Sequence, residues 1–358
     1  MITRKRSLAG LALVGAAGML LAGCGAAPTD EETSAESDFL ACAVSDEGSW
    51  NDNSFNEASM DGLLKAKDEL GVEIADAESG SIEDFEPNLG EMIAAGCDVT
   101  FGVGFNLIDA INAAAEANPE LNFVTIDGYV SGDATNLKPI EYAMAESSYL
   151  AGYLSAAYST TKIVGTYGGL DIPAVTTFMS GFYYGAKAYE TETGTPVTVL
   201  GWDPVTATGD FTDPNFDPSP FADSEGAKSI SLGQLAQGAD VIFPVAGGLF
   251  SATAEAISES GSAAVMLGVD KDIALTSPEY ADIVLTSVEK RMTQAVYDVI
   301  EETEKNGFDP TPYLGTLENG GTALSDFYDF DGKVSDEIKA KLEELKAGII
   351  DGSIDPLA

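Results

Sequence analysis

The chain has 358 residues, with 59 acidic against 17 basic side chains, a formal net charge of −42 and no histidine. So acidic a surface repels nucleic acid, and we expect no nucleic-acid partner. Without histidine the chain can build neither a Ser-His-Asp triad nor a His-ligated metal site, so we expect no enzyme, no metal and no other cofactor.

Residues 1–23 are typical of an export signal. Basic residues 4–6 precede an apolar stretch, 8–21, that is too short to span a membrane. The stretch ends in Leu-Ala-Gly-Cys, which resembles the lipobox of bacterial lipoproteins. This ending implies cleavage before Cys24 and a diacylglyceryl thioether on its sulfur. An ordinary signal peptide with an incidental cysteine is the alternative.

The segment 24–37 has almost no apolar bulk after the cysteine, so it cannot bury a core. We expect a lipidated Cys24 followed by a disordered, solvated tether. No later apolar segment is long enough to span a bilayer. The sequence therefore predicts a protein held on the extracytoplasmic face of the cell membrane by its lipid alone.

The first half of the mature chain alternates apolar runs with helical periodicity. Residues 39–44, 98–102 and 121–126 are continuous apolar runs, and residues 55–70 and 108–117 are amphipathic at helical spacing. Apolar strands without alternation indicate a parallel sheet that is covered on both faces.

The remaining two cysteines fall in this part of the chain. Cys42 lies in the first expected strand, and Cys97 stands at the head of a later one. In an oxidising compartment the two form a disulfide if their strands are neighbours. Two free, buried thiols are the alternative.

The same pattern then starts again further along the chain. The expected strands are 162–167, 196–201, 240–245 and 263–269, and the expected helices are 175–189, 229–237 and 252–259. Two doubly wound units in succession predict an α/β protein of two parallel-sheet lobes.

The last elements are too few for a third lobe. An apolar run at 282–287, a helix at 289–304 and a helix at 335–349 remain, and we expect them to cross back between the first two lobes. Residues 203–223 contain four prolines and break the periodicity, which is typical of a surface loop.

Polar and glycine residues follow six of the expected strands. Ligands of open parallel sheets bind outside the carboxyl ends of the strands. Glycine lets a ligand approach the backbone, and carboxylates accept hydrogen bonds from hydroxyl or N–H groups. Each group alone is also an ordinary turn, but together they indicate a neutral, hydroxyl-rich ligand: residues 45–48, 103–106, 127–128, 168–169, 246–248 and 270–271.

Two large aromatic residues stand in the polar stretch after the first strand. Ser54 and Glu57 have the spacing of a capping box, so Phe55 is expected in the first helical turn, at the mouth of the sheet. There it can stack on a flat ring, although a hydrophobic staple or an inward-folded ring is the alternative. Trp50 is either a lid or a loop anchor.

Lys290 is placed where a helix is expected to begin, and the helix dipole disfavours a cation there. We therefore expect it to point inward and face Asp270. A solvated Lys290–Arg291 pair is the alternative.

These stretches, taken in order, resemble the basic membrane protein family, whose members are lipoproteins and substrate-binding components of ABC-type nucleoside importers. The resemblance rests on SDEGSWNDNSFNEASMDGL, FGVGF, FVTIDG, YLAGYLSA, GGLDIPAVTTFMSGFYYGAKAY, GADVIFPVAGG, GVD and VLTSVEKRMTQAVYD. It implies the type I periplasmic-binding fold, with two lobes joined by three crossovers. The expected lobes are 38–142 plus 283–307 and 143–282 plus 308–358.

The resemblance also implies a role for particular residues. Phe55 from the first lobe and Phe178 from the second would stack on a purine. Asp46, Asn56 and Asp127 would read the base edge. Asp270 and Lys290 would hold the ribose hydroxyls, with the Gly247 backbone close by.

Three departures from the family leave the base preference open. The loop 203–223 is longer and richer in proline than expected for the family. Trp50-Asn51 replaces a more usual small or acidic residue, and Lys271 puts a cation beside the ribose ligand Asp270.

The resulting expectation is a lipid-anchored, monomeric receptor that binds adenosine, guanosine or inosine and passes it to an ABC permease. The alternatives are a sugar, an autoinducer or another small ligand in the same cleft, and an adhesin or sensor with a vestigial cleft. A hydrolase is disfavoured because histidine and the nucleophile motifs are missing.

Overall fold

The computed structural model describes residues 37–212 and 219–358. The expected signal peptide 1–23, Cys24, the tether up to residue 36 and loop residues 213–218 lie outside the described residues. Within the described ranges, no helix has the length and apolarity needed to cross a membrane.

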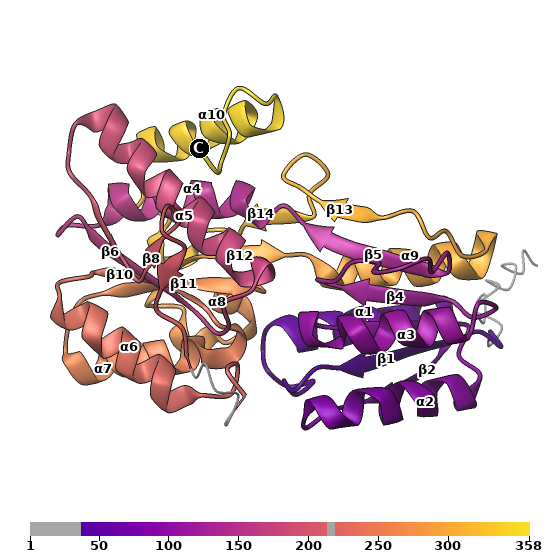
Figure 1. Cartoon of the computed structure of the whole chain (residues 1–358). Helices are drawn as coiled ribbons and strands as arrows, with labels where there is room; N and C mark the ends of the chain where they lie inside the picture. The colour runs from indigo at the N-terminus through magenta and orange to yellow at the C-terminus, as the bar shows by residue number, and fades with distance from the viewer. Residues whose placement is uncertain (1–36, 213–218) are drawn as a thin grey trace, which may run out of the picture. The chain divides into compact units, whose positions relative to one another are not determined.

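The first lobe is built on a parallel sheet of six strands in the order β13-β5-β4-β3-β1-β2 (Figure 1). Helices α1 and α9 cover one face, and α2 and α3 cover the other. Along β1, Ala41 and Ala43 pack toward the first pair of helices, whereas Cys42 and Val44 pack toward the second. The unbroken apolar run therefore reflects burial on both faces. The elements are β1 (Leu40–Ser45), α1 (Phe55–Leu70), β2 (Glu73–Ala77), α2 (Phe85–Ala95), β3 (Val99–Val103), α3 (Ile108–Ala117), β4 (Phe123–Ile126), β5 (Leu137–Tyr142), α9 (Met292–Asn306) and β13 (Tyr313–Gly315).

The second lobe repeats this plan with the strand order β14-β12-β11-β10-β6-β7, in which only the β12–β14 pair is antiparallel. Helices α4, α5 and α10 pack with the largest core cluster on one face, and α6 and α7 cover the other face. The elements are α4 (Met144–Tyr158), β6 (Ile163–Gly168), α5 (Pro173–Thr193), β7 (Thr198–Leu200), β8 (Trp202–Asp203), β9 (Thr208–Gly209), α6 (Ser224–Ala236), β10 (Val241–Val245), α7 (Phe250–Ser260), β11 (Val265–Asp270), α8 (Ile273–Thr276), β12 (Val284–Lys290), β14 (Thr322–Leu324) and α10 (Asp336–Ile350).

Small residues let α4 and α5 pack backbone to backbone. A Cβ added at Gly152 would lie 2.0 Å from the Phe182 carbonyl oxygen, and one at Gly185 would lie 1.9 Å from the Tyr149 carbonyl oxygen. Any larger side chain at these positions would force the two helices apart. The glycines in YLAGYLSA and GFYYGAKAY therefore serve this helix contact.

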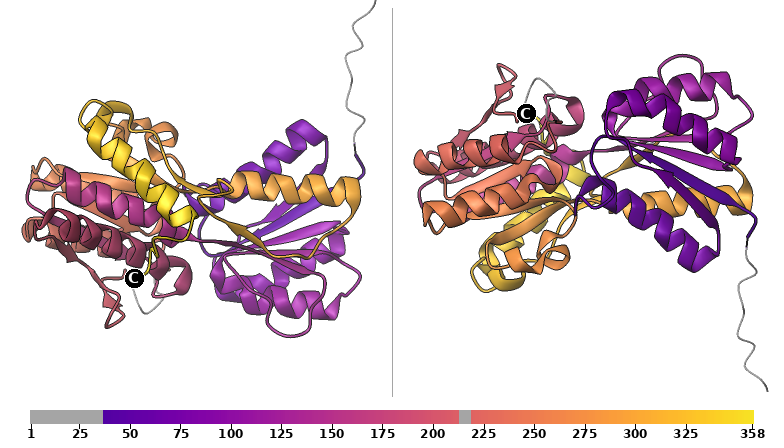
Figure 2. Two further views of the ribbon diagram at one scale, coloured as in Figure 1. Left: turned by 90° about the horizontal axis from the view of Figure 1, so that it is seen from above. Right: turned by 90° about the horizontal axis from the view of Figure 1, so that it is seen from below.

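The chain passes between the sheets three times, after β5, after β12 and between β13 and β14. Figure 2 shows the orange helix α9 returning to the indigo and purple lobe. The expected lobe boundaries at 282/283 and 307/308 differ from this sheet membership. Strand β12 pairs with β11 in the second sheet, and β13 pairs with β5 in the first. The second crossing therefore follows Lys290, and the third follows Gly315.

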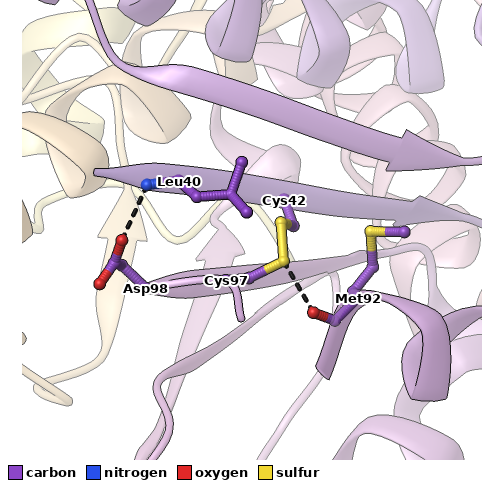
Figure 3. The surroundings of a disulfide bond; sticks show 5 residues. All are labelled: Leu40, Cys42, Met92, Cys97 and Asp98. Carbon is purple, nitrogen blue, oxygen red and sulfur yellow. Dashed lines mark hydrogen bonds between the residues drawn. A yellow bond between two sulfur atoms is a disulfide. The ribbon is translucent and has the colours of Figure 1, made fainter. Parts of the chain in front are cut away.

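Cys42 and Cys97 are joined by a disulfide in the structure, with Cα atoms 5.9 Å apart (Figure 3). The bridge is possible because β1 pairs directly with β3. Beside it, the Leu40 backbone N–H donates to Asp98 Oδ2 over 2.8 Å, and the Met92 carbonyl oxygen lies 2.9 Å from Cys97 Sγ. The bridge thus fixes the head of β3 against the neighbouring strand β1.

Candidate ligand-binding site

A cavity lies between the lobes, at the carboxyl ends of strands from both sheets. Its wall contains all eight residues proposed from the sequence: Asp46, Phe55, Asn56, Asp127, Phe178, Gly247, Asp270 and Lys290. The structure therefore brings the strand ends of both lobes to one space.

Lys290 is the cation of the cavity wall, and it is the last residue of β12 instead of the first turn of a helix. Its ammonium forms an ion pair with Asp127 of the first lobe, and its side chain is only 3% exposed. Its inward position agrees with the sequence prediction, but its ion-pair partner is Asp127 and not Asp270. Two phenylalanine rings flank the ammonium, with ring centroids 5.2 Å (Phe55) and 5.1 Å (Phe178) from Nζ.

Asp270, in the second lobe, is bound by a side chain of the first lobe. Ser54 Oγ donates to Asp270 Oδ2 over 2.8 Å. Burial raises the pKa of Asp270 to about 6, and the nearby charge of Lys290 lowers it by less. The carboxylate therefore lies in an apolar setting with capacity to accept further hydrogen bonds.

Asp127 and Asp270 occupy matching places in the two lobes. Asp127 directly follows the third strand in the order of its sheet, and Asp270 is the last residue of the third strand in the other sheet. Each has a left-handed backbone, with φ of 58° and 65°. This conformation is uncommon for residues other than glycine, and such strain gathers at functional sites. Gly247 is also left-handed, with φ of 56°, and a Cβ there would meet no atom within 4 Å. Its backbone is thus open to a ligand.

Asp46 and Asn56 form a second polar group in the first lobe. Asn56 Nδ2 donates to Asp46 Oδ1 over 2.9 Å, and the Gly48 backbone N–H donates to the same oxygen over 3.0 Å. The other carboxylate oxygen lies against Gly104, where an added Cβ would be 2.3 Å from Oδ2. Asn56 Oδ1 is buried without a hydrogen-bond partner among the described residues. Together they present acceptors to whatever fills the cavity.

We predict that Asp46→Asn stabilises the ligand-free protein at high pH but not at low pH. Burial raises the pKa of Asp46 from 3.8 to about 7, so the folded chain binds this proton more tightly than the unfolded chain. Stability linked to this group is complete below about pH 4 and is lost as the pH rises to about 7. Thermal unfolding of both proteins from pH 4 to 8 measures the difference, which we expect to reach about 4 kcal/mol in favour of the variant. A difference that does not change with pH would contradict the buried, protonated Asp46.

The start of α1 differs from the predicted capping box. Asp52 accepts from the backbone N–H groups of Ser54, Asn56 and Glu57 at 2.8, 3.0 and 3.0 Å, and so caps the helix. The Ser54 side chain makes no cap bond. It is therefore free to cross between the lobes to Asp270. Aspartate is a preferred capping residue, so Asp52, two residues before Ser54, could have been identified as the cap from the sequence.

Trp50 serves as a loop anchor. It is buried in the core of the first lobe with Ala58 and Leu63. Its backbone N–H donates to Glu78 Oε1 over 2.7 Å. Of the two roles considered from the sequence, this burial is compatible only with the anchor.

Among the described residues, the cavity wall has four aromatic residues, Phe55, Phe105, Phe178 and Phe221, and Phe221, from the proline-rich segment, is the one that sequence reasoning missed. It is half-buried, and its ring lies over Gly169, where a Cβ would be 2.4 Å from Phe221 Cε1. The segment is fastened to the sheet, since the Thr212 backbone N–H donates to the Gly168 carbonyl over 3.1 Å. Of the described residues of the 203–223 loop, Phe221 therefore belongs to the site.

Comparison with known proteins identifies one family and two relatives. Residues 39–204 match the family described as ABC transporter substrate-binding protein PnrA-like. The ABC transporter nucleoside-binding protein BmpA of Lactococcus lactis is 30% identical, over 98% of each chain. An uncharacterized lipoprotein of Pyrococcus abyssi is 31% identical over 91% of this chain and 76% of its own length.

The fold is shared with solved structures as well. A solute-binding protein of an ABC transporter system from Aeropyrum pernix matches with a TM-score of 0.76 and 25% identity, over 88% of this chain and 92% of that chain. The predicted α/β architecture, two parallel-sheet lobes of the type I periplasmic-binding fold, is thereby confirmed.

Proposed function

Because the chain belongs to the family of PnrA-like substrate-binding proteins of ABC transporters, we propose that it captures a purine nucleoside between its lobes and delivers it to a membrane permease. One observation carries the proposal. Aromatic rings from both lobes line a cavity that also holds one buried lysine and several buried carboxylates. A flat heterocycle with a hydroxyl-rich sugar needs both kinds of wall. The protein binds and releases its ligand as a monomer and catalyses no reaction.

We assign the base to Phe55 and Phe221. Phe178, the ring proposed from the sequence, is only 1% exposed and packs against Phe243. It has almost no free face to offer a ligand, whereas Phe55, Phe105 and Phe221 are half-buried in the cavity wall, and Phe55 and Phe221 come from opposite lobes. In this arrangement the ring of Phe178 contacts the Lys290 ammonium and does not contact the base.

We assign the ribose to the polar residues that lie nearest the crossovers. Strands β12 and β11 end in Lys290 and Asp270, Asp127 directly follows β4, and the crossovers leave the sheets on that side. Asp127, for which the family resemblance implies contact with the base edge, is paired with Lys290 and therefore joins the ribose group. The Gly247 backbone completes it. Asp46 and Asn56, at the end of β1 and the start of α1, read the base edge.

Isothermal calorimetry with adenosine, guanosine, inosine, cytidine and ribose tests this function. We expect the purine nucleosides to bind with Kd below about 10 μM, corresponding to about −7 kcal/mol, and ribose to give no heat. Binding of a free sugar without any purine nucleoside would overturn the proposal.

Phe55→Ala is predicted to weaken purine nucleoside binding at least about tenfold, or 1.4 kcal/mol, because it removes one stacking face. Phe221→Ala should do the same, whereas the exposed Tyr129→Ala should leave Kd unchanged. Thermal unfolding without ligand is measured alongside. If Phe55→Ala lowers the unfolding temperature and leaves Kd unchanged, Phe55 belongs to the hydrophobic core and does not contact the ligand.

Membrane attachment follows the same reasoning. We propose that Cys24 carries the lipid and holds the receptor at the extracytoplasmic face, near its permease. Mass spectrometry of the mature amino terminus tests this, and an unmodified Cys24 would rule it out.

A further inference from the structure

Lys271 joins the two lobes at a point outside the cavity. It follows β11 of the second lobe, and its ammonium lies 2.6 Å from Glu57 Oε1 and 2.8 Å from Asp61 Oδ2 of helix α1 in the first lobe. Its side chain is only 12% exposed. The cation expected beside the ribose therefore points away from the ligand.

The lobes touch closely around this ion pair. Ser54 Oγ bonds Asp270 Oδ2 over 2.8 Å, and a Cβ at Gly248 would lie 2.4 Å from the Asp52 carbonyl oxygen. Glu57 is held in place as well, since its Oε2 accepts from the Asn53 backbone N–H over 3.1 Å. The amino-terminal turn of α1 thus forms the contact between the lobes in this structure, which we call the closed form.

A partly buried lysine with two carboxylate partners differs from an exposed surface pair. Burial lowers the pKa of Lys271, but its hydrogen bonds to Asp61 and Glu57 raise it by more, so the ammonium stays charged. The two partners lie on the opposite lobe, so opening the cleft separates them. The contact therefore favours the closed form over the open form without touching the ligand.

We propose that Lys271 is a positioning residue that clamps the lobes and sets the closed fraction of the receptor, and thereby scales its affinity for every ligand alike. The inference builds on the proposed nucleoside site. Apparent Kd varies inversely with the fraction of molecules in the binding-competent form, so a weaker clamp weakens all ligands by one common factor. A residue that contacts the base would instead change the order of preference among ligands.

Lys271→Met tests the clamp through two readouts. In ligand-free protein, small-angle X-ray scattering should show a larger radius of gyration than the wild type at low salt. In calorimetry, Kd for adenosine, guanosine and inosine should each rise about tenfold, with their ratios unchanged.

Matched variants separate the clamp from a general loss of structure. Glu57→Gln with Asp61→Asn should reproduce Lys271→Met, and the triple variant should be no weaker than either, since all three residues act through one contact. Lys305→Met removes an ion pair within α9 and should change neither readout. Unchanged scattering and Kd in Lys271→Met would overturn the clamp. If no nucleoside binds the wild type, the proposed function fails, while the scattering result still decides whether Lys271 holds the lobes together.

Discussion

Replacing Lys290 with Met is expected to weaken nucleoside binding at least about a hundredfold and to lower the free energy of unfolding by about 3–5 kcal/mol. Lys290 is 3% exposed and pairs with Asp127. Its loss leaves two carboxylates, Asp127 and Asp270, in an apolar crevice without a counter-ion. The pKa of Asp270, already raised by burial, then rises further. Urea unfolding and calorimetry measure the two effects.

Two further variants show which effect belongs to the ligand. Arg291→Met alters the next residue, a half-exposed cation paired with Glu289, and should change stability by less than about 0.5 kcal/mol. Adding Asp127→Asn to Lys290→Met removes one unpaired charge and should recover part of the stability but none of the affinity. Full binding by the double variant would show that Lys290 only supports the fold.

Much of the site could be predicted because the sheet topology alone determines where ligands of this fold bind. Parallel strands bring their carboxyl ends to one edge of a sheet, so Asp46, Asp127, Gly247 and Asp270 could be gathered from four separate stretches of sequence. The structure places all of them in one cavity wall. Helix α1 likewise begins and ends at Phe55 and Leu70, because its apolar periodicity is regular and Gly71 follows in a left-handed conformation.

The errors arose where partners are distant in sequence. The capping box at Ser54 had the right spacing, but the serine binds Asp270, some two hundred residues away. Phe221 stands in a proline-rich segment with no periodicity, so nothing local indicates that its ring reaches a cleft. Lys290 was assigned to a helix because residues 289–304 are amphipathic, whereas β12 continues through it to pair with β14.

Some elements carry no periodic signal at all. Helix α4 is buried around nearly its whole circumference between α5, α10 and the second sheet, so it lacks the polar face that marks an amphipathic helix. Strand β2 is an edge strand whose residues are exposed or half-buried, and its sequence, EIADA, is only weakly apolar. Neither could be identified from hydrophobic pattern alone.

Loss of the Cys42–Cys97 bridge should lower the stability of the protein and leave its affinity for the ligand unchanged. The bridge spans 55 positions in sequence, and closing a loop of that length in the unfolded chain corresponds to about 4 kcal/mol. We therefore expect reduction, or Cys42→Ala with Cys97→Ala, to lower the free energy of unfolding by about that amount. Urea unfolding of the same protein with and without reductant measures this directly.

The binding readout should stay constant in that experiment. Cys97 stands just before β3, at the amino-terminal end of the strand, whereas the ligand contacts lie beyond the carboxyl ends of β1 and β3. As long as the variant remains folded, its Kd for purine nucleosides should stay within about twofold of the wild type, since distant and independent sites act additively. Equal unfolding midpoints with and without reductant would show that the bridge contributes nothing. A large loss of affinity in the folded, reduced protein would instead show that β1 and β3 depend on the bridge to position Asp46 and Gly104.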